Sequence, residues 1–450
     1  MPAQRDTEVA VVGAGYAGLT AAAAIADAGR DVLVLEARDR VGGRVWTADA
    51  HGVPLDLGGM WVGADHGRFR ALLDRFAIPT YPTPASGTAA WWDERAGRLR
   101  RARPLPMSPW ALPFVLPAVA RIEHMRRRTP ADQPWSAPGA ARWDALTAEQ
   151  WLRRWIPLRK PRQVVESALV LATCEELSRV SMLTLMAFVA DVGGLMHGIG
   201  GGEGGADQDL VVGGADRAAR CLAESLGDRL CLGTTVREIH HADASVVVAG
   251  DGVRVRASRA VVALPPPLVA AIRWTPALPV WRRSLIERVP MGAVTKLMAV
   301  YERPFWREAG WSGEVIDATG PVSSLFDASP PGGPAVLGSL TCGAKSRKLS
   351  DLPPGDRRAR IIDAMVTWLG PEAATPLHVA DVSWEAEELS GGGYAGVPVP
   401  GALVPSVRLA APLGRVHFAG TETAVRSNGY IDGAIASGER AAAEVLSQPD

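Results

Sequence analysis

Residues 8–36 constrain the fold more than any other stretch, because they place a strand, a glycine pattern, a helix and a second strand in one order. An apolar strand is expected at residues 8–12, three glycines follow in GxGxxG spacing, and an alanine-rich helix comes next. The second expected strand, residues 31–35, ends at Glu36, where the ribose of a bound dinucleotide needs a hydrogen-bond acceptor. The pattern therefore predicts a Rossmann-like unit with a dinucleotide site.

The small residues of the turn each have a physical role at such a site. Gly13 allows the tight turn, Gly15 lets the backbone approach a pyrophosphate, and Gly18 lets the helix pack closely on the strand. Ala14 and Ala17 complete the expected turn. The helix N-terminus adds unpaired N–H groups and a partial positive charge for the phosphates. An isolated tight turn would explain the glycines but not the elements around them.

The residues after Glu36 indicate which dinucleotide binds. In the segment ARDRVGGR, Ala37 and Arg38 are followed by two adjacent glycines, the second of which is Gly43, and by Arg44. Paired glycines bring backbone close to a ligand, and the forked donors of arginine suit phosphate charge. A nicotinamide enzyme needs no second cradle here, and a solvated charged turn needs no paired glycines. We therefore interpret the dinucleotide as FAD rather than NAD.

Charge is balanced over the whole chain but not along it. The 450 residues include 48 Lys and Arg and 48 Asp and Glu, a balance that argues neither for nor against nucleic acid, and no nucleic-acid partner is expected. Residues 95–162, the Arg-rich segment, contain 15 Arg and Lys against 4 Asp and Glu. This segment could attract an anionic substrate, a carrier protein or a membrane surface, or it could be a solvated helical face.

Cysteine usage and the apolar runs bear on the compartment. The four cysteines show no CxxC pair and no framework spacing, which is typical of a reducing cytoplasm. No run of 18 apolar residues is present, and the charged N-terminus enters the first expected strand without a signal peptide. We therefore expect a cytoplasmic protein with no membrane anchor. The histidines, including His240 and His241, show no ligand spacing, so no metal is assigned.

Changes of composition and of periodicity along the sequence predict two domains whose segments alternate along the chain. A discontinuous nucleotide-binding domain is expected from residues 1–75, 210–290 and 377–450. A substrate domain of α+β type is expected from residues 76–209 and 291–376, with a mostly helical insertion in its first part. A glycine-rich segment, residues 193–205, is expected to be mobile, either as a gating loop or as a simple connector.

Motifs along nearly the whole chain resemble those of the flavin monoamine oxidase family. They are GAGYAGL, LEARDRVGGRVWT, DLGGMWVG, VVGGADRAARCLAESLGDRLCLGTTVREI and HFAGTETAVRSNGYIDGAIASGERAA. The resemblance implies an α/β fold in which a discontinuous Rossmann-like FAD-binding domain carries an inserted α+β substrate domain. It also implies a small-molecule amine substrate and O₂. A homodimer is compatible with this interpretation.

The same motifs imply further contacts with the flavin. The helix that begins at Ile431 would direct its positive N-terminus toward the electron-rich end of the flavin ring, where negative charge develops on reduction. The implied contacts beyond the first glycine turn and its acid are Gly58, Gly59, Met60, Trp61, Val236, Trp384, Gly420, Thr421, Glu422, Gly429, Tyr430 and Ile431.

Three residues are implied to be catalytic. Tyr394 and Tyr430 match two aromatic side chains that hold an amine in front of the flavin, and ring faces also favour positive charge. Lys296 matches a lysine that reaches flavin N5 through a water and assists the reaction with oxygen. Gly393 stands where mitochondrial members have a cysteine bonded to FAD, which implies a non-covalent cofactor. Two core tyrosines and a solvent-facing lysine are the alternative interpretation.

These inferences predict an FAD-dependent amine oxidase that converts an amine to an imine and reduces O₂ to H₂O₂. The imine would hydrolyse to an aldehyde or ketone and ammonia. The alternative is a related flavin desaturase or an amino acid oxidase acting as a biosynthetic tailoring enzyme. Residues 58–63, GGMWVG, lack the arginine of the corresponding segment in amino acid oxidases. A non-catalytic flavin-fold binding protein is a third hypothesis, against which Lys296 and the two tyrosines argue.

Overall fold

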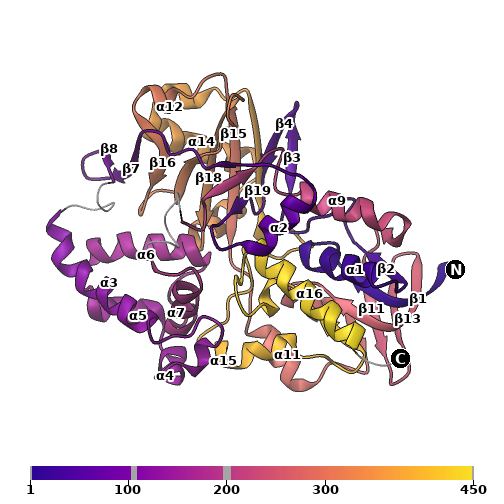
Figure 1. Cartoon of the computed structure of the whole chain (residues 1–450). Helices are drawn as coiled ribbons and strands as arrows, with labels where there is room; N and C mark the ends of the chain where they lie inside the picture. The colour runs from indigo at the N-terminus through magenta and orange to yellow at the C-terminus, as the bar shows by residue number, and fades with distance from the viewer. Residues whose placement is uncertain (1–2, 103–108, 196–203, 448–450) are drawn as a thin grey trace.

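Two large β-sheets organise the computed structural model of the chain, which describes residues 3–102, 109–195 and 204–447. An eight-stranded sheet with its helices lies beside a seven-stranded sheet, and a layer of helices flanks the second sheet (Figure 1). Helices and strands alternate through both parts of the molecule. The structure therefore confirms the predicted α/β class.

The eight-stranded sheet brings together three separated parts of the chain. Its order is β10-β2-β1-β13-β12-β11-β14, and β20 pairs with β13. The central strand β1 runs parallel to both β2 and β13, and it begins five residues earlier than the sequence pattern indicated. The strands are β1 (Ala3–Val12), β2 (Val32–Leu35), β10 (Leu230–Cys231), β11 (Val236–His241), β12 (Val246–Gly250), β13 (Val253–Val262), β14 (Arg273–Thr275) and β20 (Val416–Phe418).

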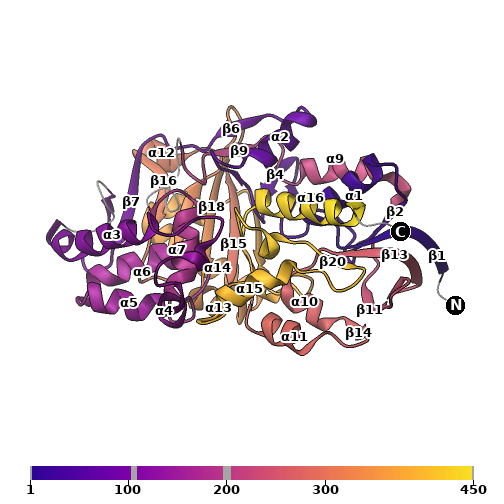
Figure 2. The same cartoon turned by 60° about the horizontal axis from the view of Figure 1, so that its bottom comes forward.

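Apolar side chains on both faces of β1 explain why helices cover both sides of this sheet. Val9 and Val11 belong to a core shared with α1, α9 and α16, whereas Ala10 and Val12 belong to a core shared with α10 and α11. The alternation follows from the two-residue period of a strand. In Figure 2, α16 lies along α1, with α10 and α11 at the other side of the sheet. These helices are α1 (Tyr16–Asp27), α9 (Arg217–Leu226), α10 (Pro266–Ala271), α11 (Val280–Glu287) and α16 (Ile431–Ser447).

The seven-stranded sheet has the order β19-β15-β18-β17-β16-β7-β8. All eight residues of β15 are buried, because neighbouring strands and helices cover it on every side. The predicted domain boundary at residue 377 lies just before β19, which pairs with β15 in this sheet; the domain boundaries stay a prediction. The elements are β7 (Thr88–Asp93), β8 (Arg98–Arg101), β15 (Val294–Tyr301), β16 (Trp311–Ile316), β17 (Ser324–Asp327), β18 (Ala335–Cys342), β19 (His378–Ser383), α12 (Phe305–Glu308), α13 (Ala344–Ser350) and α14 (Pro354–Leu369).

Short elements connect these two sheets. One small sheet pairs β3 with β4, and another has the order β5-β9-β6. Strand β9, which comes shortly after the glycine-rich segment, lies in the middle of this second sheet and pairs with β5 and β6. Helix α2 packs against α16. The bounds are β3 (Thr47–Ala50), β4 (Val53–Asp56), β5 (Trp61–Val62), β6 (Thr80–Pro82), β9 (Asp209–Val211) and α2 (Gly67–Arg75).

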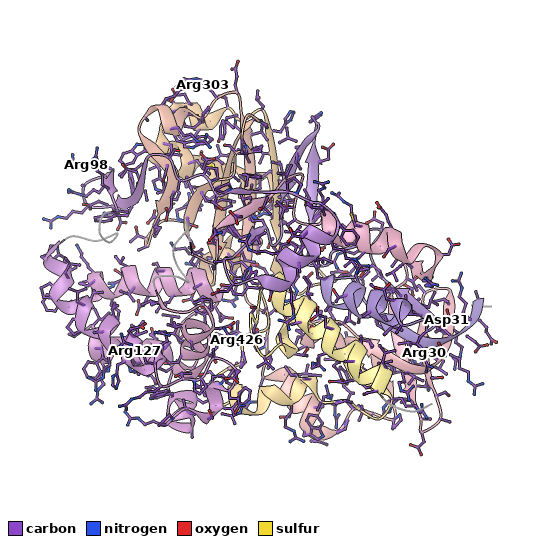
Figure 3. All side chains as sticks on the ribbon, in the orientation of Figure 1. Arg30, Asp31, Arg98, Arg127, Arg303 and Arg426 are labelled. Carbon is purple, nitrogen blue, oxygen red and sulfur yellow. The ribbon has the colours of Figure 1, made fainter. Side chains whose placement is uncertain are left out.

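The helical layer contains most of the Arg-rich segment. Its helices share an apolar core, and the arginines lie mainly on the outside. Figure 3 shows Arg98 at the outer edge of the molecule, and the side chain of Arg127 is 73% exposed. Several of them pair with acids one helical turn away, as Arg153 does with Glu149 at 2.8 Å. Across the described ranges, no helix combines the length and the apolar character that a membrane crossing requires. The helices are α3 (Leu112–Arg126), α4 (Ala140–Ala145), α5 (Ala148–Trp155), α6 (Arg159–Thr173), α7 (Met182–Asp191) and α15 (Leu403–Ser406).

Candidate functional site

A cavity of about 1060 Å³ lies where the two large sheets and the helical layer meet. Its wall includes Gly15 from the first glycine turn, Lys296 from β15, Phe326 from β17, Phe188 from α7 and Ile431 from the start of α16. Segments from both ends and from the middle of the chain therefore surround one space. A cavity of this size is large enough for a dinucleotide together with a small substrate.

Nearly all the predicted cofactor residues line this cavity, and Ala14 and Gly18 lie behind it. The main-chain N–H of Ala14 donates to Glu36 Oε2 at 2.7 Å, and a Cβ on Gly18 would stand 1.9 Å from the carbonyl oxygen of Gly13. Both residues therefore shape the turn from within. The predicted residues that line the cavity are Gly13, Gly15, Ala17, Glu36, Ala37, Arg38, Gly43, Arg44, Gly58, Gly59, Met60, Trp61, Val236, Trp384, Gly420, Thr421, Glu422, Gly429, Tyr430 and Ile431.

The turn after β1 fits a dinucleotide. Gly15 has an extended backbone that any residue can adopt (φ −74°, ψ 175°), and apart from the neighbouring residues in the chain a Cβ there would meet no atom nearer than Gly43 Cα at 3.9 Å. The fold therefore leaves room for a side chain at Gly15, and the glycine fits a close approach of the ligand at this point. The Glu36 carboxylate is held by N–H donors from Ala14 at 2.7 Å and Arg38 at 2.9 Å. These bonds fix an acceptor at the cavity wall where a ribose hydroxyl can donate to it.

The two arginines that were predicted to bind phosphate both line the cavity, and both are paired with carboxylates of the protein. Arg38 donates to Glu387 at 2.7 Å and to Ser390 at 2.9 Å. Arg44 donates to both oxygens of Glu422, at 2.6 and 3.1 Å, and to the carbonyl oxygen of Tyr394 at 2.8 Å. Burial acts to raise the pKa of Glu422, but the charge and hydrogen bonds of Arg44 outweigh it, so the pKa is lowered. Arg44 thus fixes Glu422 and the backbone of Tyr394 at the same wall.

Lys296 lies deep in the cavity wall and is only 2% exposed. Its Nζ donates to the carbonyl oxygen of Gly58 at 2.9 Å and to Met60 Sδ at 2.8 Å. The ring centroids of Trp61 and Phe326 lie 5.3 and 5.6 Å from the same nitrogen, within cation–π range. Burial lowers the pKa of Lys296 to about 7, although nearby carboxylates oppose the shift. The ammonium can therefore lose its proton near neutral pH, which no solvent-facing lysine does.

Tyr394 and Tyr430 both line the cavity, as the sequence motifs implied. The Tyr430 ring lies 4.8 Å from the ring of His66, centroid to centroid. The Tyr394 hydroxyl lies 4.0 Å from Cys342 Sγ, which in turn is 3.3 Å from Cys174 Sγ. Burial raises the pKa of both phenols, so both rings stay neutral under ordinary conditions. Neutral aromatic rings at one cavity suit a bound amine.

Four ionisable residues at or near the cavity were missed by sequence reasoning. His66 supports Tyr430, and burial lowers its pKa. Burial raises the pKa of Asp56 to about 6, that of Asp207 to about 7, and that of Glu314 above its ordinary value. Asp207 lies at the end of a glycine-rich run that carries no periodic signal. Glu314 could have been found from the alternation of β16, where acids are unexpected on a buried face.

This arrangement defines an FAD-binding oxidoreductase with an enclosed substrate cavity. The family described as flavin containing amine oxidoreductase matches residues 16–446, and the chain belongs to this family. A putative flavin-containing monoamine oxidase AofH of Mycobacterium tuberculosis is 36% identical over 441 residues, covering 97% of this chain and 96% of that protein.

Solved structures of amine oxidases have the same fold. Wild-type putrescine oxidase bound to putrescine has a TM-score of 0.92 at 29% identity, covering 99% of this chain and 100% of that one. Cyclohexylamine oxidase from Brevibacterium oxydans IH-35A has a TM-score of 0.91 at 32% identity, covering 98% of each chain. The predicted family, monoamine-oxidase-like fold and FAD cofactor are thereby confirmed.

Most of the predicted gating loop or connector, residues 193–205, lies outside the described residues. Within the described residues, no group of three His, Cys, Asp or Glu side chains is arranged to hold a metal ion.

Proposed function

We propose that the protein is an oxidase that converts a primary amine to an imine and passes the electrons to O₂, giving H₂O₂. The supporting observation is that Lys296, Tyr394 and Tyr430, from distant segments, line one cavity with the FAD-binding glycines. The names of the similar proteins, putrescine oxidase and cyclohexylamine oxidase, also point to an amine as the substrate. Bound FAD would supply the electron-accepting chemistry.

The chain's own residues would bind and orient the amine. Tyr394 and Tyr430 would hold it between neutral rings, and the enclosed cavity would favour the unprotonated form because an isolated buried ammonium is costly. The unprotonated amine keeps the lone pair that imine formation requires. Lys296 would hold or release a proton at Nζ, since its pKa of about 7 leaves both forms populated at neutral pH.

A peroxide-coupled screen across mono-, di- and polyamines, aromatic amines and amino acids tests this proposal. If the protein is an oxidase, an amine should bleach its bound flavin without oxygen, and the protein should form peroxide in air. Bleaching that yields a carbon–carbon double bond without ammonia would favour the desaturase, and turnover restricted to amino acids would favour an amino acid oxidase. A protein that never takes up FAD would leave only the binding-protein hypothesis.

The role of Lys296 can be tested separately from substrate binding. Lys296→Met should slow reoxidation of the reduced enzyme by O₂ more than it slows reduction by the amine. Stopped-flow traces of the two half-reactions measure this directly. Unchanged reoxidation would remove Lys296 from the oxygen reaction.

We propose that FAD is held without a covalent bond, because Gly393 has no side chain to form one and lies in the cavity wall. A Cβ at this position would stand 2.9 Å from Val294 Cγ1, so the packing is built around glycine. Acid precipitation should leave all the flavin in the supernatant. Yellow colour in the washed pellet would contradict this.

Three further expectations from the sequence stay predictions. They are homodimer formation, a cytoplasmic location, and binding of a carrier protein or an anionic substrate at the Arg-rich segment.

A further inference from the structure

Two carboxylates face the cavity without a role in the chemistry above. Glu314 lies on β16, where Ser312, Glu314 and Ile316 line the cavity in alternation, while Val315 is fully buried on the opposite face. Asp207 lies two residues before β9 and lines the same cavity. The two carboxylates therefore reach one space from different sheets.

The register of the seven-stranded sheet shows how far Glu314 lies from Lys296. Lys296 pairs with Leu340, Leu340 with Ser324, and Ser324 with Ile316, which gives one row across four strands. At the usual spacing between strands the row is about 14 Å long. Glu314 is the neighbour of Ile316 on the same face. Lys296 and Glu314 thus lie on the first and the last of these four strands, along one wall of the cavity.

Asp207 acts on both ends of this row. Its charge influences the pKa of Lys296, Tyr394 and Tyr430, and Glu314 influences the pKa of Asp207. Asp207, which lines the cavity, therefore lies within electrostatic reach of Lys296, of both tyrosines and of Glu314.

Within the described ranges, neither carboxylate has a hydrogen-bond or ion-pair partner at its side-chain oxygens. The Thr83 hydroxyl donates to the main-chain oxygen of Asp207 at 2.7 Å, and the main-chain N–H of Glu314 donates to Ser312 Oγ at 3.2 Å. Burial is the main cause that raises the pKa of both acids. An enclosed carboxylate without donors is costly, and a cationic ligand removes that cost.

We propose that Asp207 and Glu314 form a second ammonium-binding subsite, so that the preferred substrates are linear diamines or polyamines. This inference rests on the proposed function and adds to it the class of amine. The reacting nitrogen would lie unprotonated between Tyr394 and Tyr430, and the second nitrogen, protonated, would pair with the carboxylates. Phe326, on the strand next to β16, would contact the methylene chain between them.

Lys296, at the other end of the row, supports this polarity. A second ammonium near Lys296 would meet a like charge, whereas one near Glu314 meets an opposite charge. A charge-assisted hydrogen bond to a desolvated carboxylate is worth about 1.5–3 kcal/mol. The second nitrogen should therefore raise kcat/KM by about 10- to 100-fold over a monoamine of the same length.

The test compares substrates on FAD-loaded enzyme. Linear α,ω-diamines of increasing length are each compared with the n-alkylamine of equal carbon number, and the ratio of kcat/KM is measured for wild type, Asp207→Asn and Glu314→Gln. Glu224→Gln, at an exposed position on α9, is the matched control. We expect a ratio above about 10 at an optimal length in wild type and control, falling at least about tenfold in the two cavity variants.

A binding measurement separates this inference from the proposed function. Calorimetry on the FAD-loaded protein compares an alkyltrimethylammonium ion with the uncharged alcohol of equal chain length. Tighter binding of the cation that is lost in Glu314→Gln would support the subsite even if no amine reduces the flavin, in which case the proposed function fails alone. Amine turnover with no preference for diamines, and no change of the ratio in either variant, would overturn the subsite.

Discussion

Two sets of carboxylates at the cavity differ in their partners. One set lies in the nucleotide half of the molecule, built on the eight-stranded sheet, and the other, Asp207 and Glu314, lies in the substrate half, built on the seven-stranded sheet, the helical layer and the small β5-β9-β6 sheet. In the nucleotide half, Glu36 accepts hydrogen bonds from two main-chain N–H groups, and Arg44 donates to both oxygens of Glu422. In the substrate half, the side-chain oxygens of Asp207 and Glu314 meet no donor from the described residues.

The difference follows from what each half must recognise. FAD presents the same phosphates and ribose every time, so a rigid site with satisfied polar groups binds it without further rearrangement. A substrate pocket gains selectivity when it holds a buried charge without a partner. A ligand of opposite charge removes the desolvation cost of that charge, whereas a ligand without the matching charge leaves the cost in place. The difference between the partnered carboxylates of the cofactor site and the unpartnered Asp207 and Glu314 can be tested by substitution.

The largest effect is expected at the first glycine turn. Gly15→Val should weaken FAD binding by about 10,000-fold or more, because the side chain would fill the space of the pyrophosphate and separate its charge from several N–H donors worth about 1.5–3 kcal/mol each. The stability of the FAD-free protein should change by less than about 1 kcal/mol. Flavin titration and thermal unfolding measure the two quantities.

Gly18→Val is the control for this turn. Its Cβ would overlap the carbonyl oxygen of Gly13, so it should destabilise the FAD-free protein as well as weaken FAD binding. If Gly15→Val also lowered the stability of the FAD-free protein, Gly15 would serve the fold and the assignment of its role to the ligand would be wrong.

The next effect is expected at the pair between Arg44 and Glu422. Arg44→Met should lower the free energy of unfolding by about 3–5 kcal/mol, since it leaves a buried carboxylate without its cation. The pKa of Glu422 is lowered in the intact protein, so the pair contributes stability above the unfolded pKa and loses it as the pH falls through the folded pKa. The destabilisation should therefore be full at pH 7 and shrink in acid.

Denaturant unfolding of the FAD-free protein across that pH range checks this prediction. The double variant Arg44→Met with Glu422→Gln should recover part of the loss, because the uncompensated charge is gone. A loss that is equal at every pH would show that Arg44 stabilises through packing and not through its charge.

The FAD cofactor and the place of the glycine turn at the cavity could be predicted from the sequence because their requirements are local. Gly13, Gly15 and Gly18 stand in a short turn whose spacing is set by the ligand, and Glu36 follows at the end of the next strand. The cavity-facing position of Lys296 came from resemblance to a family motif, not from periodicity, since β15 is buried on both faces and shows no alternation.

The alternation of β16 can mark Glu314 as an acid on a buried face, but it cannot show that Asp207 lies at the same cavity. Asp207 and Glu314 reach one cavity through the pairing of β9 with β5 and of β16 with β17, which no local pattern specifies. The pairing of Arg38 with Glu387 joins residues far apart in the chain and was missed for that reason. The sequence predicts where the cofactor binds, whereas the charge balance of the cavity depends on long-range contacts.

A smaller effect of opposite sign is expected at Lys296. The pKa is about 7 in the folded protein against 10.5 for a free lysine, so the unfolded chain binds more protons between these values and wild-type stability rises with pH. Lys296→Met should stabilise the protein by about 2 kcal/mol below pH 7, since part of the gain is offset by the lost bonds to Gly58 and Met60. The gain should vanish toward pH 10.5.

Thermal unfolding of both proteins at several pH values measures this difference. Lys348→Met, on a surface turn of α13, is a control that should show no such pH dependence. A destabilised Lys296→Met protein at pH 7 would mean that the ammonium is well solvated by its partners and does not carry a burial cost.

The smallest effect is expected for Tyr430→Phe, at the border between the two halves. Among the described residues, no hydrogen bond reaches the Tyr430 hydroxyl, and the ring rests on His66 at 4.8 Å. The ring, which would pack against the unprotonated amine and orient it, survives in phenylalanine. We expect kcat/KM for amines to change by less than about threefold in Tyr430→Phe and to fall by about 30-fold in Tyr430→Ala, because only the second removes the aromatic wall that orients the amine. Equal, large losses in both would show that the hydroxyl itself binds the substrate, and Tyr430 would then belong with the polar groups of the substrate half.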